Sequence, residues 1–89
     1  MAVVERVVTI VNELGLHARP SAEFVKLASK FSSDVSLVRD GNAVNGKSIL
    51  GVMTLAAERG TPLTLRAEGE DAEEAIRSLE ELVARGFEE

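Results

Sequence analysis

Gly15-Leu16-His17-Ala18-Arg19-Pro20-Ser21 joins a stretch rich in β-branched residues to a stretch with helical periodicity, and the fold can be worked out from this junction. Upstream, residues 3–11 are mostly valine and isoleucine, which predicts a strand. Downstream, apolar residues recur at the three-and-four spacing of an amphipathic helix, which we expect to run to about Phe31. Proline is tolerated in the first helical turn and is costly further in, so Pro20 fixes the helix start near residues 17–20.

His17, the only histidine in the chain, is therefore expected at or beside the N-cap of this helix. Backbone N–H groups in a first helical turn have no intrahelical acceptor, and the helix dipole adds partial positive charge there. Both effects favour an anion and disfavour a protonated imidazole, so we expect a neutral, nucleophilic ring. A phosphoryl group on that ring would meet the N–H groups of Ala18 and Arg19 and the Arg19 guanidinium. An ordinary capping histidine is the alternative.

Turn and capping signals predict the remaining elements. Glu74 lies three residues after Asp71, so we expect these two to form a variant of the capping box at the start of the last helix. In chain order we expect strands at 35–39 and 43–44 around an Asp40-Gly41 turn, a helix that begins after Ser48 and ends at Gly60, and a strand at 63–67. The last helix is expected to begin at Asp71 and to end at Gly86. This order predicts an α+β fold with helices on one face of a sheet.

Length and composition narrow the function classes. The 89 residues suffice for one domain, which we place at 1–89, and the absence of cysteine excludes disulfides and thiolate chemistry. A single histidine disfavours a histidine metal site, so we expect no metal and no cofactor. The net charge of −5 argues against nucleic-acid binding. Without a signal peptide or membrane-spanning run, we expect a soluble, cytoplasmic protein with no membrane insertion.

The net charge conceals an uneven distribution. Residues 17–47 carry five basic and three acidic side chains, whereas residues 68–89 carry two basic and nine acidic ones. A relatively basic region around His17 would suit a phosphorylated centre and acidic protein partners. A solvated last helix with excess acids explains the same distribution.

Residues 41–48 match the P-loop expression G-x-x-x-x-G-K-[ST]. A P-loop requires a buried parallel strand before its first glycine and a long helix after its serine. Here Asp40-Gly41 is expected in a hairpin turn, and the variable positions include a strand. We therefore do not expect nucleotide binding through this segment.

Two segments resemble one protein family. Gly15-Leu16-His17-Ala18-Arg19-Pro20 resembles the active-site segment of HPr, the histidine phosphocarrier of the bacterial phosphoenolpyruvate-dependent sugar phosphotransferase system. Val44-Asn45-Gly46-Lys47-Ser48-Ile49-Leu50-Gly51-Val52-Met53 resembles the regulatory-serine segment of that family, at the right distance downstream. The resemblance covers essentially the whole chain. It implies an open-faced sandwich with a four-stranded antiparallel sheet of order 1-4-2-3, covered on one face by three helices, in the order βαββαβα.

The resemblance also implies a function. His17 would accept a phosphoryl group on its pros nitrogen from phospho-enzyme I and pass it to enzyme IIA domains in sugar uptake. Arg19 would support the phosphate, the backbone N–H groups of Ala18 and Arg19 would bind it, and Pro20 would position the helix start. Such a protein is a stoichiometric carrier and not an enzyme, and we expect it to be a monomer.

The second segment implies regulation and docking. Ser48 would be phosphorylated by an HPr serine kinase/phosphorylase. A transcriptional regulator would then be a further partner. Ile49, Leu50 and Met53 would form an exposed apolar patch that docks partner proteins. Helical spacing alone favours core packing for at least one of these three.

Alternative functions remain at this stage. The chain could be a regulatory docking module that acts through Ser48 and the apolar patch, or a small-molecule-binding domain with a pocket. It could also serve the nitrogen-related branch of the phosphotransferase system, although residues 47–51 favour the sugar branch. The retained His17 argues against regulatory HPr-like proteins that lack the histidine. Leu14 departs from the small polar residue common in the family, which puts a side-chain contact from this loop to the phosphate in doubt.

Overall fold

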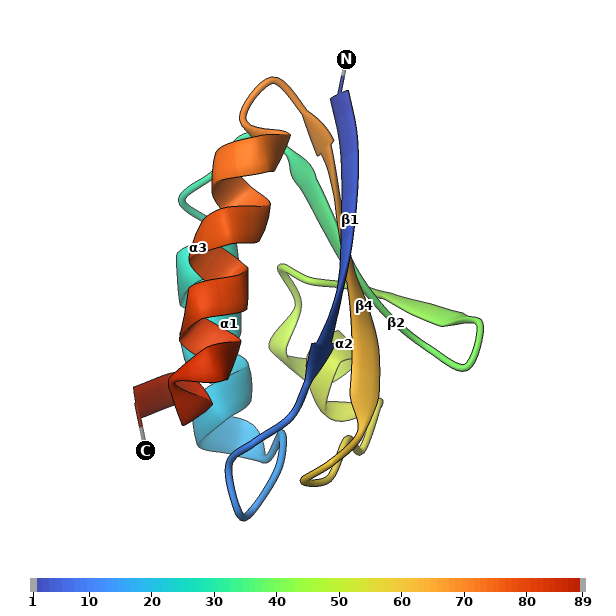
Figure 1. Ribbon diagram of the computed structural model, residues 1–89, viewed down its shortest axis with the longest axis vertical. Coiled ribbons are helices and arrows are strands. Elements are labelled where there is room, and N and C mark those ends of the chain that lie inside the picture. The colour runs from blue at the N-terminus through green and yellow to red at the C-terminus, as the bar shows by residue number, and fades with distance from the viewer. Residues whose placement is uncertain (1, 89) are drawn as a thin grey trace.

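The computed structural model describes residues 2–88, which form a four-stranded antiparallel sheet with three α-helices on one face (Figure 1). The elements are β1 (Ala2–Thr9), α1 (Ala18–Ala28), β2 (Asp34–Arg39), β3 (Asn42–Asn45), α2 (Ile49–Met53), β4 (Pro62–Gly69) and α3 (Ala72–Ala84), followed by a 3₁₀ turn, η1 (Gly86–Glu88). The strand order β1-β4-β2-β3 confirms the predicted fold. None of the helices within residues 2–88 is both long and apolar enough to cross a membrane.

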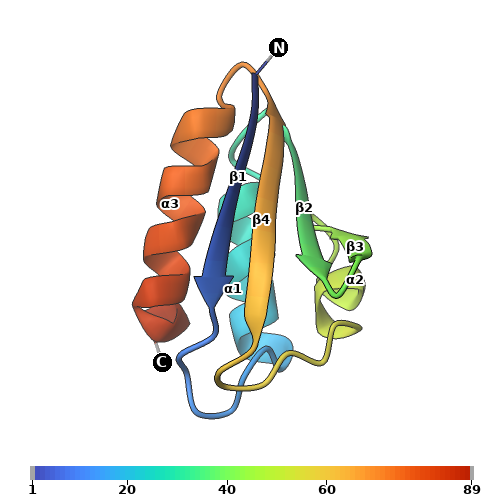
Figure 2. The ribbon, with the colours of Figure 1, turned by 45° about the vertical axis from the view of Figure 1, so that its right-hand side comes forward.

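β4 is an inner strand of the sheet, and its residues alternate strictly between the two faces. Leu63, Leu65 and Ala67 are buried under the helices, whereas Thr64 and Arg66 between them are only half-buried on the open face. β1 pairs with β4 along its whole length, and β2 pairs with the opposite edge of β4. Figure 2 shows the strands side by side, with α1 behind them and α3 beside β1, and these two helices supply the other half of the core.

The second helix is shorter than predicted. α2 ends at Met53, and the chain does not continue as a helix to Gly60. Ala56 has a φ of 49°, which lies outside the helical region. The Arg39 guanidinium donates hydrogen bonds to the Leu55 carbonyl at 2.7 Å and the Ala56 carbonyl at 3.1 Å, and so holds the chain in this non-helical path. β1 and α1 also end before the predicted positions, at Thr9 and Ala28.

The capping box predicted at the start of α3 is wrong. Asp71 makes no side-chain capping bond in α3. Its carboxylate instead accepts hydrogen bonds from the N–H and hydroxyl of Ser32, at 2.8 Å and 3.3 Å, from the N–H of Ser33 at 2.9 Å, and from the Ser33 hydroxyl. The bond from the Ser33 hydroxyl, together with the other three, lowers the pKa of Asp71 from 3.8 to about 2. Asp71 therefore ties the turn after α1 to the start of α3.

Because of this carboxylate, we expect the stability of the fold to depend on pH in the acid range. Because the folded-state pKa of Asp71 is depressed, its contribution is present above the unfolded pKa of 3.8 and is lost as the pH falls toward the folded value of about 2. We expect Asp71→Asn to be less stable than the parent at neutral pH. The difference in unfolding free energy should shrink between about pH 5 and pH 2. Urea unfolding followed by circular dichroism measures this difference.

Asp40→Asn is the matched control, because the Asp40 side chain is 94% exposed. A difference between parent and Asp71→Asn that stays constant over the acid range would contradict the assigned role of these hydrogen bonds.

Candidate functional site

His17 is the N-cap residue of α1. Its backbone is extended, with φ −77° and ψ −170°, and its carbonyl accepts the first helical hydrogen bond, from the Ser21 N–H at 3.1 Å. The side chain is half-buried, and Pro20 is buried in the first turn. The structure thus confirms the predicted helix start. Figure 1 shows that α1 begins at the end of the molecule to which β1 leads, and His17 is the residue immediately before this helix.

The first turn of α1 presents hydrogen-bond donors beside His17. Pro20 has no N–H, and the N–H of Ser21 is bonded to His17, which leaves the N–H groups of Ala18 and Arg19 without an intrahelical acceptor. The first turn contains no acidic residue that would offset the positive end of the helix dipole. Arg19 is exposed, and no ion pair joins it to another of residues 2–88. This combination can stabilise an anion next to the imidazole.

The loop before His17 is attached to the loop before β4, a contact that the sequence did not predict. The Leu16 N–H donates to the Ala57 carbonyl at 2.8 Å, and the hydroxyl of the fully buried Ser21 donates to the Leu16 carbonyl at 3.2 Å. Leu16 is therefore held at both of its peptide groups immediately before the histidine. A serine in a first helical turn is too common a feature to have revealed this role from sequence.

Gly15 is required where the two loops meet. It has a φ of +69°, and a Cβ at this position would lie 2.4 Å from the Ala57 carbonyl oxygen. A side chain would therefore meet both backbone strain and a steric clash. The close approach of the two loops depends on the missing side chain.

Ser48 caps α2, as predicted. Its Oγ accepts a hydrogen bond from the Gly51 N–H at 3.1 Å. Ser48 is half-buried at the start of a helix that contacts α1. It thus lies on the same side of the sheet as the helix that follows His17.

The apolar side chains after Ser48 are exposed. We expected at least one of Ile49, Leu50 and Met53 in the core, and this expectation is wrong: their exposed fractions are 42%, 77% and 37%. The anchoring positions are instead Val52 and Leu55, which are buried. Ile49, Leu50 and Met53, here called the α2 patch, leave three apolar side chains open to a partner.

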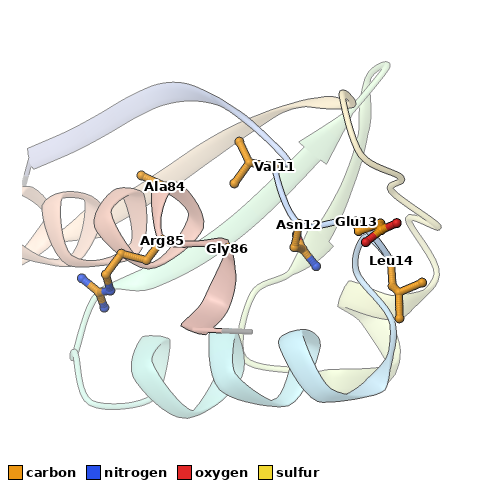
Figure 3. Close-up of a pocket in the computed structure, with 7 residues that line it drawn as sticks. All are labelled: Val11, Asn12, Glu13, Leu14, Ala84, Arg85 and Gly86. Carbon is orange, nitrogen blue, oxygen red and sulfur yellow. The ribbon is translucent and has the colours of Figure 1, made fainter.

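Leu14 is also exposed, at 76%, on the loop that leads to His17. It lies at one side of a surface hollow formed by Val11, Asn12, Glu13 and Leu14 from this loop and by Ala84, Arg85 and Gly86 from the end of α3 (Figure 3). Neither His17 nor Arg19 lines this hollow. Among the described residues, no three His, Asp or Glu side chains form a group that could hold a metal ion.

Comparison with known proteins gives consistent matches. Residues 4–85 match the family model for the PTS HPr component phosphorylation site. The chain is 47% identical over 85 residues to the phosphocarrier protein HPr of Xylella fastidiosa Temecula1, covering 96% of both chains. It is 50% identical over 76 residues to the HPr-like protein Crh of Bacillus subtilis, covering 85% of this chain and 89% of Crh. The crystal structure of an HPr from Thermoanaerobacter tengcongensis matches with a TM-score of 0.93 at 48% identity, covering 97% of each chain.

Gly15→Ala should lower the free energy of unfolding by more than about 3 kcal/mol, because the strain of a positive φ and the clash with Ala57 act together. Gly41→Ala is the matched control: Gly41 has a φ of +81°, but a Cβ there meets nothing within 4 Å. It should cost only about 1 to 2 kcal/mol. Equal losses in urea unfolding would show that the close approach of the loops does not matter.

Proposed function

The chain belongs to the HPr phosphocarrier family of the phosphotransferase system, and from this premise we propose that it relays a phosphoryl group through His17. The donor would be a phosphohistidine of enzyme I, and the acceptor a histidine of an enzyme IIA domain in sugar uptake. The observation that carries the proposal is the half-buried His17 at the N-cap of α1, beside the donor N–H groups of Ala18 and Arg19.

In the proposed transfer, the lone pair of the pros nitrogen of His17 attacks the phosphorus, and the N–P bond to the enzyme I histidine breaks as the new one forms. The helix-terminal N–H groups and the Arg19 guanidinium stabilise the charge on the phosphate oxygens. Pro20 holds the first turn so that these donors and the ring keep their relative positions. In the second transfer His17 is the leaving group. The chain is regenerated unchanged, so we propose a stoichiometric carrier that needs no cofactor.

We propose that the α2 patch docks both partners in turn. α2 contacts α1, the helix that begins after His17. A partner that covers the exposed apolar side chains of α2 would therefore approach the molecule from the same side of the sheet as this helix. The relay requires enzyme I to leave before enzyme IIA binds, so one surface can serve both.

Ser48 would provide regulation in the same place. A phosphate on this N-cap residue would meet helix N–H groups, so the fold should tolerate it, while its charge would lie beside the α2 patch. We propose that modification by an HPr serine kinase/phosphorylase weakens docking.

A second candidate is a docking module for a transcriptional regulator, and the likeness to Crh favours it: one matching structure is described as the Bacillus subtilis catabolite repression HPr, at 49% identity. The relay takes precedence because the chain has a histidine at the N-cap position. The nitrogen-related branch is a further possibility that the transfer assay distinguishes by the enzyme I that reacts. The monomeric state and the cytoplasmic location stay predictions, and one matching structure, from Thermoanaerobacter tengcongensis, is described as an HPr dimer.

The relay predicts phosphorylation of His17. With phosphoenolpyruvate, magnesium and enzyme I, the protein should acquire one acid-labile, base-stable phosphate that mass spectrometry maps to His17, and His17→Ala should acquire none. Arg19→Ala should lower the transfer rate about tenfold or more through loss of charge stabilisation. Arg77→Ala, an exposed arginine on α3, is the control and should react at the parent rate.

An absence of phosphate with the enzyme I of the same organism would overturn the relay. Docking of a regulator that survives His17→Ala would then favour the regulatory module.

The regulatory role of Ser48 predicts that Ser48→Asp raises the KM of enzyme I for the carrier several-fold with little change in melting temperature, because aspartate also caps a helix. Ser48→Ala is the matched variant: it should lose about 1 kcal/mol of stability with the cap and keep the parent KM. A Ser48→Asp carrier that accepts phosphate at the parent rate would refute the proposed effect of the charge.

A further inference from the structure

Asn12 forms hydrogen bonds with Gly15 through both its backbone and its side chain. The Asn12 carbonyl accepts the Gly15 N–H at 3.1 Å, and the Asn12 Nδ2 donates to the Gly15 carbonyl at 2.6 Å. The Asn12 side chain is buried, with 7% of the residue exposed. Figure 3 shows the Asn12 side chain on the loop before α1, where it points toward that helix. This turn therefore has two hydrogen bonds across its ends, shielded from water.

We infer that Asn12 is a positioning residue for the relay, which fixes the turn that delivers His17 to the N-cap of α1. The inference rests on the proposed function. Asn12 would act through Gly15 and Leu16 on the histidine and would not itself touch the phosphate.

The path from Asn12 to His17 is short and continuous. Asn12 fixes the Gly15 peptide, and Leu16 is then held by the Ala57 carbonyl and the Ser21 hydroxyl. If the Nδ2 donor is lost, the buried Gly15 carbonyl loses this partner and the turn can relax. Any such shift moves the His17 ring relative to the N–H groups of α1.

Phosphoryl transfer is sensitive to such a shift, because the attacking nitrogen, the phosphorus and the leaving nitrogen must lie in line. A misplacement of about 1 Å can cost about a hundredfold in rate. The turn also requires an amide and not a carboxylate. Aspartate has the same shape as asparagine, but its ionised oxygens would face the Gly15 carbonyl with no hydrogen to donate.

The test uses Asn12→Asp and Asn12→Ala, with Glu13→Ala as the control. Glu13 is exposed in the same turn and takes no part in the hydrogen bonds between Asn12 and Gly15. In transfer from phospho-enzyme I, both Asn12 variants should show a kcat about tenfold to a hundredfold lower. The KM should change less than about twofold, because the α2 patch is intact. A loss confined to KM, or a parent kcat in both variants, would overturn the inference.

A second measurement does not depend on phosphate transfer. Because His17 is the only histidine, its ring gives one set of NMR signals. These signals should move in both Asn12 variants and stay in place in Glu13→Ala, and ring signals that stay in place in all three would overturn the inference. If the parent takes no phosphate on His17, the proposed function fails, and the ring signals still decide whether Asn12 positions the ring.

The parent protein provides a check if the Asn12 variants do not fold. At least one Asn12 side-chain amide proton should exchange slowly with solvent, because Nδ2 is buried and donates a hydrogen bond to the Gly15 carbonyl. Rapid exchange of both protons would overturn the inference.

Discussion

The register between β1 and β4 is the constraint on which the rest of the structure depends. β4 buries only one face, so the register must place Val4 and Val8 of β1 beside Ala67 and Leu63, on the side that the helices cover. The pairing that satisfies this requirement places Thr9, the last residue of β1, opposite Pro62, the first residue of β4. The loop after one strand therefore lies beside the loop before the other. The contact between Leu16 and Ala57 follows directly, and with it the location of His17.

Rigidity around His17 comes from long-range contacts more than from α1 itself. A helix N-terminus alone is prone to fraying, because the backbone N–H groups of its first turn have no intrahelical acceptors. Here the segment before it is held from three directions, by Asn12 within the loop, by Ala57 across the sheet end and by Ser21 within the helix. The residues that set this geometry are buried, whereas Arg19 and Leu14 remain exposed. The site is thus a fixed backbone that carries accessible side chains.

The sequence predicted correctly those features, such as helix starts, that depend on interactions between residues close together in the chain. Pro20 and the apolar periodicity indicated the start of α1, and Ser48 indicated the start of α2, because capping and first-turn preferences involve residues a few positions apart. The failures have the opposite origin. Asp71 is bonded to Ser32, 39 positions away, and Arg39 redirects the chain after α2 from 16 positions away. The role of Asn12 was equally hidden, because an asparagine between a strand and a helix is ordinary loop composition. The strand order came from family resemblance and not from periodicity.

The exposure of the α2 patch follows from the shortness of α2. A helix of five residues has few positions, and burying Val52 on its inner side directs its neighbours outward. Leu50 is 77% exposed, and the contact of its apolar surface with water is unfavourable in free energy. Contact with an apolar partner surface would offset this unfavourable term. Three side chains nevertheless form a small patch, well below what a long-lived interface of roughly 1,200 to 2,000 Å² requires. In the proposed relay the carrier must release one partner before it meets the next. A small docking surface suits this requirement, because tight docking of either partner would stop the proposed relay.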